Sequence, residues 1–427
     1  MYDLHTQAYA LPLPFLAKQH ALFSLRHAKF LPTPYQHEDS NRMTLAYFCL
    51  SSLALLPAAA VSTSDHHLSA LDVLTKSSQR QGWADWIYEQ QLSSGGFRGS
   101  DVLTTGQSDD VTEHSAAGAS SSTLQPARTA APASFSSFDT PHIIQSYTAL
   151  LNLALSGDSF ERLNRQGLLS FLASCQNADG SFSHFPGCEE APDPRSTYSA
   201  FAIASMLHDW TTIDADQALS FLNSCRRFEG GFAQRSGSEA NAGPTYCAVA
   251  SFSLCSRLSD LPHPEKLLRW LVDRQIRPPP AAPASEGDSS SEVDEATEGQ
   301  IPEQEMAGFQ GRPNKPTDAC YSFWNTAALQ LLLPTFSPPL RLSDLIDPSL
   351  DRNWLLHCQH KLYGGIAREP GATPDVYHTY LSLAALSLGD CQGASLGPSV
   401  LDLRPLDPAW NVSKEVAERI KERLWRS

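Results

Sequence analysis

Apolar and polar residues follow one another along this chain in two kinds of helical pattern. Segments of the first kind, such as 267–274, carry charged residues on one face, as helices at a surface do. Segments of the second kind, such as 141–156 and 320–334, contain no Asp, Glu, Lys or Arg. A helix without a charged face is normally buried. The pattern therefore predicts two layers, with amphipathic helices outside and apolar helices inside.

The two kinds of segment alternate in a repeated unit. An amphipathic segment ends in Gln or Arg, a glycine-containing turn follows, and an apolar segment comes next. The units run from Gln91 to Gly95-Gly-Phe97, from Gln176 to Gly180-Ser-Phe182, from Arg226 to Gly230-Gly-Phe232, from Gln275 to Gly308-Phe-Gln-Gly311 and from Gln359 to Gly364-Gly-Ile366. Glycine suits a helix C-cap followed by a tight reversal, so each unit predicts a helical hairpin.

This repeat predicts an all-α fold in a single domain covering residues 1–427. The turns and the starts of the inner helices should gather at one end of a closed ring of hairpins, although an open superhelix is the alternative. Two segments interrupt the pattern, 101–138, which is rich in Ser, Thr and Ala, and 278–304, which is a Pro run followed by acidic, Ser-rich sequence. Both compositions predict flexible insertions.

The formal net charge of −15 is unevenly distributed. Residues 286–305 hold eight acids and residues 101–127 hold four, and neither stretch contains Lys or Arg. The rest of the chain is close to charge balance, which argues against a nucleic-acid-binding face. The nine cysteines form no Cys-x-x-Cys pair, which favours reduced thiols and a cytoplasmic location. No apolar run is long enough to predict a membrane span.

Candidate chemistry is concentrated in the run Gly311-Arg-Pro-Asn-Lys-Pro-Thr-Asp-Ala-Cys-Tyr-Ser-Phe-Trp324. Its cations Arg312 and Lys315 suit a phosphate-bearing ligand. Asp318 and Cys320 offer oxygen and sulfur ligands for zinc, and His378 offers a third ligand. Zinc beside a phosphate site suggests a thiol nucleophile that displaces a diphosphate.

Each of these residues also has a simpler interpretation. Asp318 is suited to cap a helix that starts near Cys320, and Cys320 alone predicts a small buried apolar residue. His378 alone predicts a hydrogen-bonded core histidine, and Arg312 and Lys315 alone predict solvated loop charges. The sequence pattern by itself leaves both interpretations open.

The chain resembles the β subunits of protein prenyltransferases, most closely those of geranylgeranyltransferase type I. The motifs that carry this resemblance are Met43-Thr-Leu-Ala-Tyr-Phe48, Gly96-Phe-Arg-Gly-Ser100, the 311–324 run and Trp410-Asn-Val-Ser413. The resemblance implies an α/α barrel (toroid) and a heterodimer with a prenyltransferase α subunit. It also implies transfer of geranylgeranyl from its diphosphate to the cysteine of C-terminal CaaX motifs, with X often Leu, on proteins such as Rho-type small GTPases.

The resemblance also implies roles for individual residues. One zinc ion is implied at Asp318, Cys320 and His378, which would be the catalytic centre. The implied diphosphate-binding residues are Arg312, Lys315, Tyr321 and Asn241. The implied lipid and peptide channel residues are Thr44, Phe48, Tyr147, Arg195, Tyr198 and Trp324. Asn241 departs from the family, which has a histidine there; an amide still donates a hydrogen bond but brings no charge.

Three positions bear on which prenyltransferase the chain resembles. Thr44 and Phe48 match type I, whereas the farnesyltransferase has bulky tryptophans, so the smaller residue leaves depth for a fourth isoprene unit. Arg368 stands where the farnesyltransferase has a magnesium-binding aspartate, which implies that a side-chain cation replaces magnesium. Tyr377, however, matches the farnesyltransferase, and a farnesyltransferase β subunit is the alternative.

Two other classes compete with a protein prenyltransferase. A terpene cyclase uses similar helical barrels but needs an Asp-rich motif, and the candidate pair Asp109-Asp110 falls inside a predicted insertion. A non-catalytic helical-repeat scaffold would need neither zinc nor a phosphate site.

Overall fold

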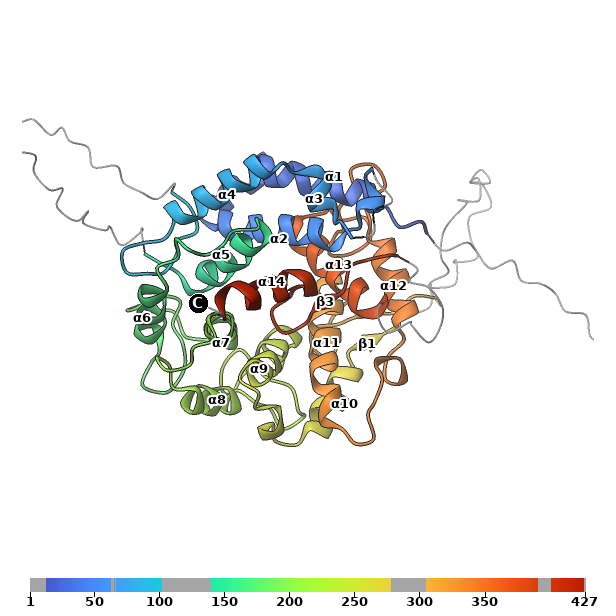
Figure 1. Ribbon diagram of the computed structural model, residues 1–427. Helices are drawn as coiled ribbons and strands as arrows, with labels where there is room; N and C mark the ends of the chain where they lie inside the picture. The colour runs from blue at the N-terminus through green and yellow to red at the C-terminus, as the bar shows by residue number, and fades with distance from the viewer. Residues whose placement is uncertain are drawn as a thin grey trace, which may run out of the picture.

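The computed structural model describes residues 13–62, 65, 67–101, 140–277, 305–390 and 401–425. Within these residues six inner helices form a closed ring, because each packs on the next and the last packs on the first (Figure 1). The inner helices are α2 (Arg42–Leu55), α5 (Ile143–Leu155), α7 (Pro194–Leu207), α9 (Ala242–Leu254), α11 (Ala319–Leu332) and α13 (Val376–Asp390). The predicted closed ring is confirmed, and the open superhelix is wrong.

A second layer of helices surrounds this ring (Figure 1). The outer helices are α1 (Ala17–Lys29), α4 (Ser77–Glu89), α6 (Arg165–Cys175), α8 (Ala215–Ser224), α10 (Pro264–Val272) and α12 (Pro348–His357). Helix α10 shows why the outer layer is amphipathic, since Leu267, Trp270 and Leu271 are buried while Glu265 and Arg269 are exposed. The inner helices are buried on nearly every side, and they carry the core of the molecule.

Short elements connect and finish the two layers. The 3-10 helices are η1 (Thr33–Asn41), η2 (Ala58–Ala60), η3 (Leu258–Asp260), η5 (Leu333–Thr335) and η6 (Leu342–Asp344). Helices α3 (Ala70–Leu74) and α14 (Lys414–Leu424) lie outside the two rings. Strands β1 (Gln275–Ile276) and β2 (Gly308–Phe309) form one antiparallel pair, and β3 (Leu406–Asp407) and β4 (Val412–Ser413) form another. Apart from Asp101, the predicted insertions 101–138 and 278–304 fall outside the described residues.

The repeated glutamine joins one hairpin to the next. Gln176 accepts the backbone N–H of Asp214 through Oε1 and donates to its carbonyl through Nε2, both at 2.8 Å. Equivalent bonds join Gln91 to Asn164 and Gln275 to Asp347. In the last unit Gln359 accepts from the N–H of Leu16 (2.9 Å), just before α1. The same kind of glutamine hydrogen bond therefore links neighbouring hairpins and also closes the ring.

The glycine turns dock on the next outer helix. Gly95 has φ 98°, and a Cβ there would come within 1.8 Å of the carbonyl carbon of Gly167 in α6. Gly364 has φ 71°, and a Cβ there would lie 2.2 Å from the carbonyl oxygen of Gln19 in α1. Any larger residue would push the hairpins apart at these two contacts. The predicted reversals thus serve both as turns and as contacts between units.

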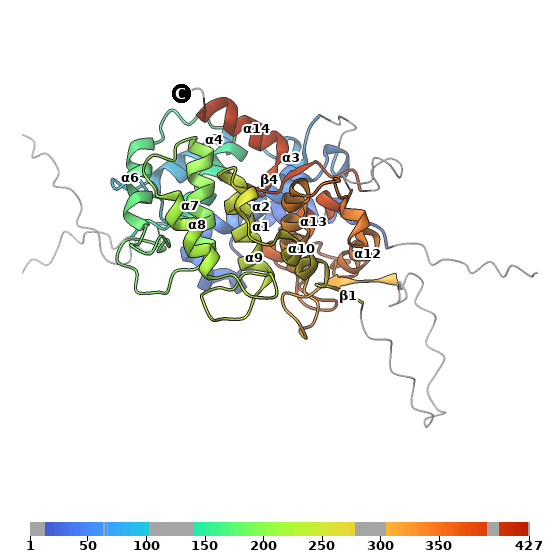
Figure 2. The same ribbon diagram turned by 90° about the horizontal axis from the view of Figure 1, so that it is seen from below.

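The C-terminal segment closes one end of the ring. Tyrosine hydroxyls from five inner helices donate to the consecutive carbonyls of residues 408–411 inside the ring. The pairs are Tyr246 with Pro408, Tyr198 with Ala409, Tyr147 with Trp410, and both Tyr47 and Tyr380 with Asn411. Helix α14 follows and lies on the face opposite β1 (Figure 2). The other end of the ring, where the inner helices begin, is the one that holds the site.

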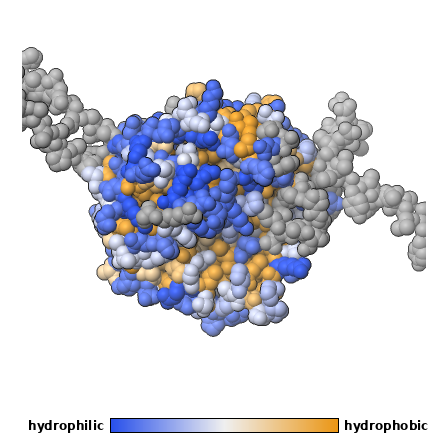
Figure 3. Space-filling view, in the orientation of Figure 1, coloured by the Kyte–Doolittle hydropathy of each residue, from blue (hydrophilic) through white to orange (hydrophobic). Residues whose placement is uncertain are grey.

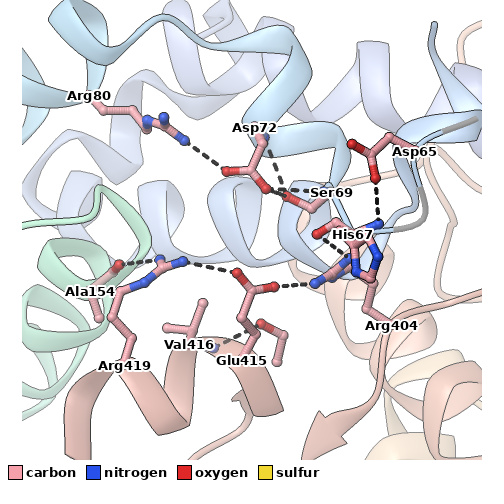
Figure 4. A network of polar contacts seen from close by, with 11 residues as sticks. Asp65, His67, Ser69, Asp72, Arg80, Ala154, Arg404, Glu415, Val416 and Arg419 are labelled. Carbon is pink, nitrogen blue, oxygen red and sulfur yellow. Dashed lines mark hydrogen bonds and ion pairs between the residues drawn. The ribbon is translucent and has the colours of Figure 1, made fainter. Parts of the chain in front are cut away.

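Charged side chains fasten α14 to this closed end (Figure 4). Glu415 contacts both Arg404 and Arg419, and the Arg419 guanidinium also donates to the carbonyl of Ala154 at the end of α5 (3.0 Å). Hydrophilic residues therefore cover the centre of this face (Figure 3). None of the described helices is both long and apolar enough to cross a lipid bilayer.

Candidate metal centre and cavity

Three potential metal ligands meet where α11 and α13 begin. Asp318 is the N-cap of α11, Cys320 is in its first turn, and His378 is in the first turn of α13. One ligand atom from each residue lies within 4.8 Å of the other two. Because α11 and α13 are neighbours in the inner ring, residues 58 positions apart in the sequence share one site.

Hydrogen bonds hold the three side chains in this arrangement. Asp318 Oδ1 accepts the N–H of Cys320 (2.9 Å), so the N-cap predicted by the simpler interpretation is present as well. His378 Nε2 lies 3.3 Å from Asp318 Oδ1. His378 Nδ1 lies 2.6 Å from Oδ2 of Asp375, a residue that the sequence analysis did not single out. Capping and metal binding are thus compatible uses of the same carboxylate.

The charges of the site depend on one another. Burial works to raise the pKa of Asp318, but hydrogen bonds from His378 and Cys320 bring it below its usual value. Burial works to lower the pKa of His378, but hydrogen bonds with Asp318 and Asp375 raise it to about 9. Burial, and then the Asp318 carboxylate, raises the pKa of the Cys320 thiol well above its usual value. A cation bound here would replace the protons on His378 and Cys320.

The donor set is the kind that transition metals accept. A carboxylate oxygen, a thiol sulfur and an imidazole nitrogen are all known ligands of zinc, and three protein ligands leave a fourth position for a substrate. Cys320 is buried, whereas Asp318 and His378 are half-buried. The geometry therefore fits a metal ion held at the edge of the ring interior.

The predicted diphosphate-binding residues lie beside this centre. Arg312 and Lys315 are on the loop between β2 and α11, and the Gly311 carbonyl accepts the N–H of Ala242 (2.8 Å), which brings that loop to the start of α9. Asn241 caps α9 by accepting the N–H of Gly243 (3.1 Å). The ring of Tyr321 packs directly on Gly311, where a Cβ would lie 2.0 Å from the ring. The loop between β2 and α11 and the starts of α9 and α11 therefore lie together.

Arg312 already has an acidic partner. Its Nη1 lies 2.6 Å from Oε2 of Glu239, which is two residues before Asn241. Both side chains are nearly half exposed, so solvent weakens this pair and a phosphate group can compete for the guanidinium. Arg368 is likewise exposed and pairs with Glu369 (2.6 Å), and its carbonyl accepts the N–H of Ala319 at the start of α11 (2.9 Å).

A cavity of about 1000 Å³ opens next to the metal centre. Thr44, Phe48 and Arg195 line it, as do Asp375 and Tyr377. The Phe48 and Tyr377 rings meet edge to face with centroids 5.5 Å apart, so Tyr377 and Phe48 together form one wall. Three of the six predicted channel residues are therefore brought to one cavity.

Two of these lining residues are held by neighbours. Thr44 Oγ1 donates to Gln145 Oε1 (3.0 Å), and Gln145 in turn donates to Asn41 (2.9 Å). Arg195 is bonded by Asp193, whose oxygens accept from its backbone N–H (2.8 Å) and from its guanidinium Nη2 (2.5 Å). The small Thr44 and the cationic Arg195 therefore have defined orientations.

The remaining three predicted channel residues are placed differently. Tyr147 and Tyr198 are buried, and their hydroxyls donate to the C-terminal segment. Trp324 packs against Tyr246, with ring centroids 5.1 Å apart. None of the three belongs to the lining of the cavity described here. Their role in a lipid channel stays a prediction.

Comparison with known proteins agrees with this fold. A family model described as the prenyltransferase alpha-alpha toroid domain matches residues 15–412. The chain belongs to the prenyltransferase α/α toroid family. The predicted all-α toroid is thereby confirmed.

Several relatives in this family match nearly the whole chain. The geranylgeranyl transferase type-1 subunit beta of Dictyostelium discoideum is 31% identical over 410 residues, which cover 93% of this chain and 95% of that protein. The subunit of the same name from Arabidopsis thaliana is 30% identical over 406 residues, which cover 89% and 87%. The protein farnesyltransferase subunit beta of Schizosaccharomyces pombe is 27% identical over 439 residues, which cover 96% and 92%.

A solved structure shows the same fold. The structure of Candida albicans protein geranylgeranyltransferase-I complexed with GGPP matches with a TM-score of 0.69 and 24% identity, and it covers 96% of this chain and 99% of that one. Together with the sequence relatives, the family match confirms the resemblance to prenyltransferase β subunits of type I.

The prenyltransferase toroid also contains site residues that the sequence analysis missed. Asp375 and Glu239 contact His378 and Arg312, and Gln145 orients Thr44. Asp375 carried a visible signal, because an acid three residues before His378 at the start of an apolar segment predicts a helix cap. No sequence pattern indicated Glu239 or Gln145, because their partners lie 73 and 101 residues away in the sequence.

Proposed function

We propose that this chain is the catalytic β subunit of a zinc-dependent protein geranylgeranyltransferase type I. It transfers geranylgeranyl from its diphosphate to the cysteine of C-terminal CaaX motifs, with X often Leu, on proteins such as Rho-type small GTPases. The observation that carries the proposal is the meeting of Asp318, Cys320 and His378 beside a large cavity in a prenyltransferase toroid. A scaffold without catalysis would have no use for this arrangement.

The metal is proposed to be one zinc ion held by Asp318, Cys320 and His378. When bound, zinc supplies the acidity that turns a cysteine thiol, with its ordinary pKa of about 8.5, into a reactive thiolate near neutral pH. The protein residues supply a fixed position for that thiol at the mouth of the cavity. Phe48 and Tyr377 form an aromatic wall of the cavity beside that position.

The reaction itself is a substitution at C1 of the prenyl diphosphate. A carbon–sulfur bond forms, the carbon–oxygen bond to diphosphate breaks, and the thiol proton goes to solvent. Arg312 and Lys315 stabilise the negative charge that grows on the leaving diphosphate, while Tyr321 and Asn241 donate hydrogen bonds to it. Arg368 takes the place of magnesium as a further cation, so the reaction does not require added magnesium.

The cavity accommodates the lipid and the peptide. Thr44 leaves depth where a tryptophan would block the chain, and Arg195 offers a cation to the peptide side. Tyr147, Tyr198 and Trp324 are proposed to form the deeper aromatic part of the channel. An α subunit is proposed to complete the enzyme. A cytoplasmic location is proposed because all eight cysteines among the described residues are free thiols.

A lipid competition experiment tests this function. The chain is co-expressed with a prenyltransferase α subunit and offered geranylgeranyl and farnesyl diphosphate together, with peptides ending in Leu or Met. We expect geranylgeranyl transfer to the Leu peptide. Preferred farnesyl transfer would instead identify a farnesyltransferase β subunit, which Tyr377 in the cavity wall favours. A complex without turnover on either lipid would refute the proposal.

A further inference from the structure

Asp375 uses both of its carboxylate oxygens on the same residue. It precedes α13, and its Oδ1 accepts the backbone N–H of His378 at 2.8 Å. Its Oδ2 lies 2.6 Å from Nδ1 of the His378 ring. The other ring nitrogen, Nε2, faces Asp318 at 3.3 Å. One side chain therefore controls both the backbone and the ring of a metal ligand.

This contact decides which ring nitrogen keeps its hydrogen when the His378 ring is neutral, as it is in a metal ligand. An ionised carboxylate can only accept a hydrogen bond, so His378 Nδ1 must be the donor. Nε2 is then the nitrogen left to provide a lone pair on the side of Asp318 and Cys320. The arrangement matches the carboxylate–histidine pairs that orient ligands in other metal proteins.

Asp375 is itself held from two directions. Its carbonyl accepts the N–H of Thr379 in the first turn of α13 (3.0 Å), and its backbone pairs with Ile366 in the preceding turn. The next residue, Val376, donates its N–H to the hydroxyl of Tyr35 (3.2 Å). The carboxylate therefore starts from a fixed backbone, which a group that orients a ligand requires.

We propose that Asp375 is a positioning residue of the metal centre, which fixes the tautomer and direction of the His378 ring. The inference rests on the metal centre of the proposed function. It distinguishes Asp375 from an ordinary N-cap such as Asp214, which accepts the N–H of Gln217 (2.9 Å) at the start of the outer helix α8 and contacts no metal ligand. A simple cap would affect folding only.

Asparagine at position 375 separates the two roles. Its side-chain oxygen can still accept the N–H of His378, so the cap is kept. Its amide group is neutral and cannot hold the Nδ1–H as a carboxylate does, so the ring loses its defined tautomer. Alanine at position 375 removes both functions, and Asp214→Ala is the control that removes a cap alone.

The test measures metal binding rather than turnover. Full-length variants, in the complex with the α subunit, are titrated with Zn²⁺ against a chromophoric chelator, and Co²⁺ is used as a spectroscopic probe. We expect Asp375→Asn to unfold near the wild-type denaturant midpoint but to bind Zn²⁺ about 10- to 100-fold more weakly. Its Co²⁺ absorption bands should shift. Asp214→Ala should lower the midpoint and leave Zn²⁺ affinity unchanged.

Two results would overturn the inference in distinguishable ways. If Asp375→Asn binds Zn²⁺ with wild-type affinity and gives the wild-type Co²⁺ spectrum, Asp375 is only a helix cap, and the metal centre stands. If the wild-type complex binds neither Zn²⁺ nor Co²⁺ stoichiometrically, the metal centre and the proposed function both fail.

Discussion

Single residues at the starts of the inner helices hold the functional side chains in position. The first turn of a helix leaves backbone N–H groups without partners, so a polar cap is required there in any case. In three inner helices the capping acid also contacts the side chain or backbone of a site residue two or three positions later. These pairs are Asp193 with Arg195, Asp318 with Cys320, and Asp375 with His378. The acids that cap these three helices therefore also position the site residues.

Replacement of Cys320 by alanine tests the proposed metal centre directly. The change removes the sulfur ligand and leaves two ligands, so we expect loss of stoichiometric metal. Turnover should fall by more than about 100-fold, because loss of a residue that only hydrogen-bonds to a metal ligand already costs up to about 100-fold. Elemental analysis and steady-state kinetics measure the two effects. Cys175→Ala, another buried cysteine at the end of α6, is the control and should keep both metal and turnover. An active, metal-loaded Cys320→Ala would remove this residue from the centre.

Replacement of Glu239 by glutamine tests the proposed diphosphate site. If Arg312 binds the diphosphate as proposed, Glu239 competes with that ligand for the guanidinium, so its neutralisation should strengthen binding of the prenyl diphosphate. An exposed ion pair contributes about 1 kcal/mol at most, so the dissociation constant should fall by up to about fivefold. Titration at low and high salt measures this, and the gain should shrink as salt rises. Glu418→Gln, in the exposed pair with Lys421 on α14, is the control. Weaker binding by Glu239→Gln would mean that Glu239 positions Arg312 instead.

The site could be predicted only in part at this scale. The residue types pointed to Asp318, Cys320 and His378 as possible ligands, but the resemblance to prenyltransferases was needed to choose a metal over the simpler interpretations. Asp375 was predictable as a cap but not as a partner of the ring, because the side-chain direction of His378 depends on the packing of α13. The pair of Arg312 and Glu239 depends on a turn that no local pattern specifies.

At the scale of elements, the repeat determined most of what could be predicted. Gln91, Gln176, Gln275 and Gln359 occupy the same place in four of the five units and contact the start of the next outer helix. The sequence pattern showed the repetition but not its contact, since a glutamine side chain has no preferred partner. The contact between the last unit and α1, here called the seam, could not be predicted, because Gln359 and Leu16 are 343 residues apart.

His20 makes this seam sensitive to acid. The residue is fully buried in α1, where Nδ1 accepts the N–H of Gly365 (3.0 Å) and Nε2 contacts Gln359 Oε1 (2.9 Å). Burial lowers the pKa of His20 to about 4. Between pH 6.5 and 4 the unfolded chain therefore binds more protons at this position than the folded chain, and stability falls as the pH falls. Above pH 6.5 this contribution is constant.

Replacement of His20 by glutamine should remove part of this acid sensitivity. The amide can supply an acceptor and a donor but does not titrate, so the loss of unfolding free energy between pH 7 and 4.5 should be about 2–3 kcal/mol smaller than in the wild type. Urea unfolding of the full-length chain at the two pH values measures the difference. The same pH dependence in His20→Gln and wild type would show that His20 is not the titrating group.

At the scale of the whole molecule, the ring is completed by a segment that belongs to no repeat. Five inner helices send a tyrosine hydroxyl to the carbonyls of residues 408–411, so the C-terminal segment touches most of the ring at once. The predicted hairpins account for the two layers, but nothing in their pattern specifies an end closure. The resemblance to prenyltransferases implies a channel role for two of these tyrosines, Tyr147 and Tyr198, and an aromatic residue on an apolar helix suits either place.

Replacement of Tyr246 by phenylalanine tests this closure. The hydroxyl of Tyr246 donates to the carbonyl of Pro408 (2.9 Å), and Tyr246 is fully buried. The change leaves that carbonyl without its donor in a place that water does not reach, so the free energy of unfolding should fall by about 1–3 kcal/mol. Tyr363→Phe, on an exposed turn, should change it by less than about 0.5 kcal/mol. Because Tyr246 also contacts the hydroxyl of Tyr198 (3.2 Å), the double variant with Tyr198→Phe should deviate from additivity.

Metal content should remain at the wild-type level in each of these variants, because the C-terminal closure and the candidate metal centre lie at opposite ends of the ring. Denaturant unfolding with parallel zinc analysis measures both quantities, and a Tyr246→Phe chain as stable as wild type would show that the C-terminal segment is held by packing alone.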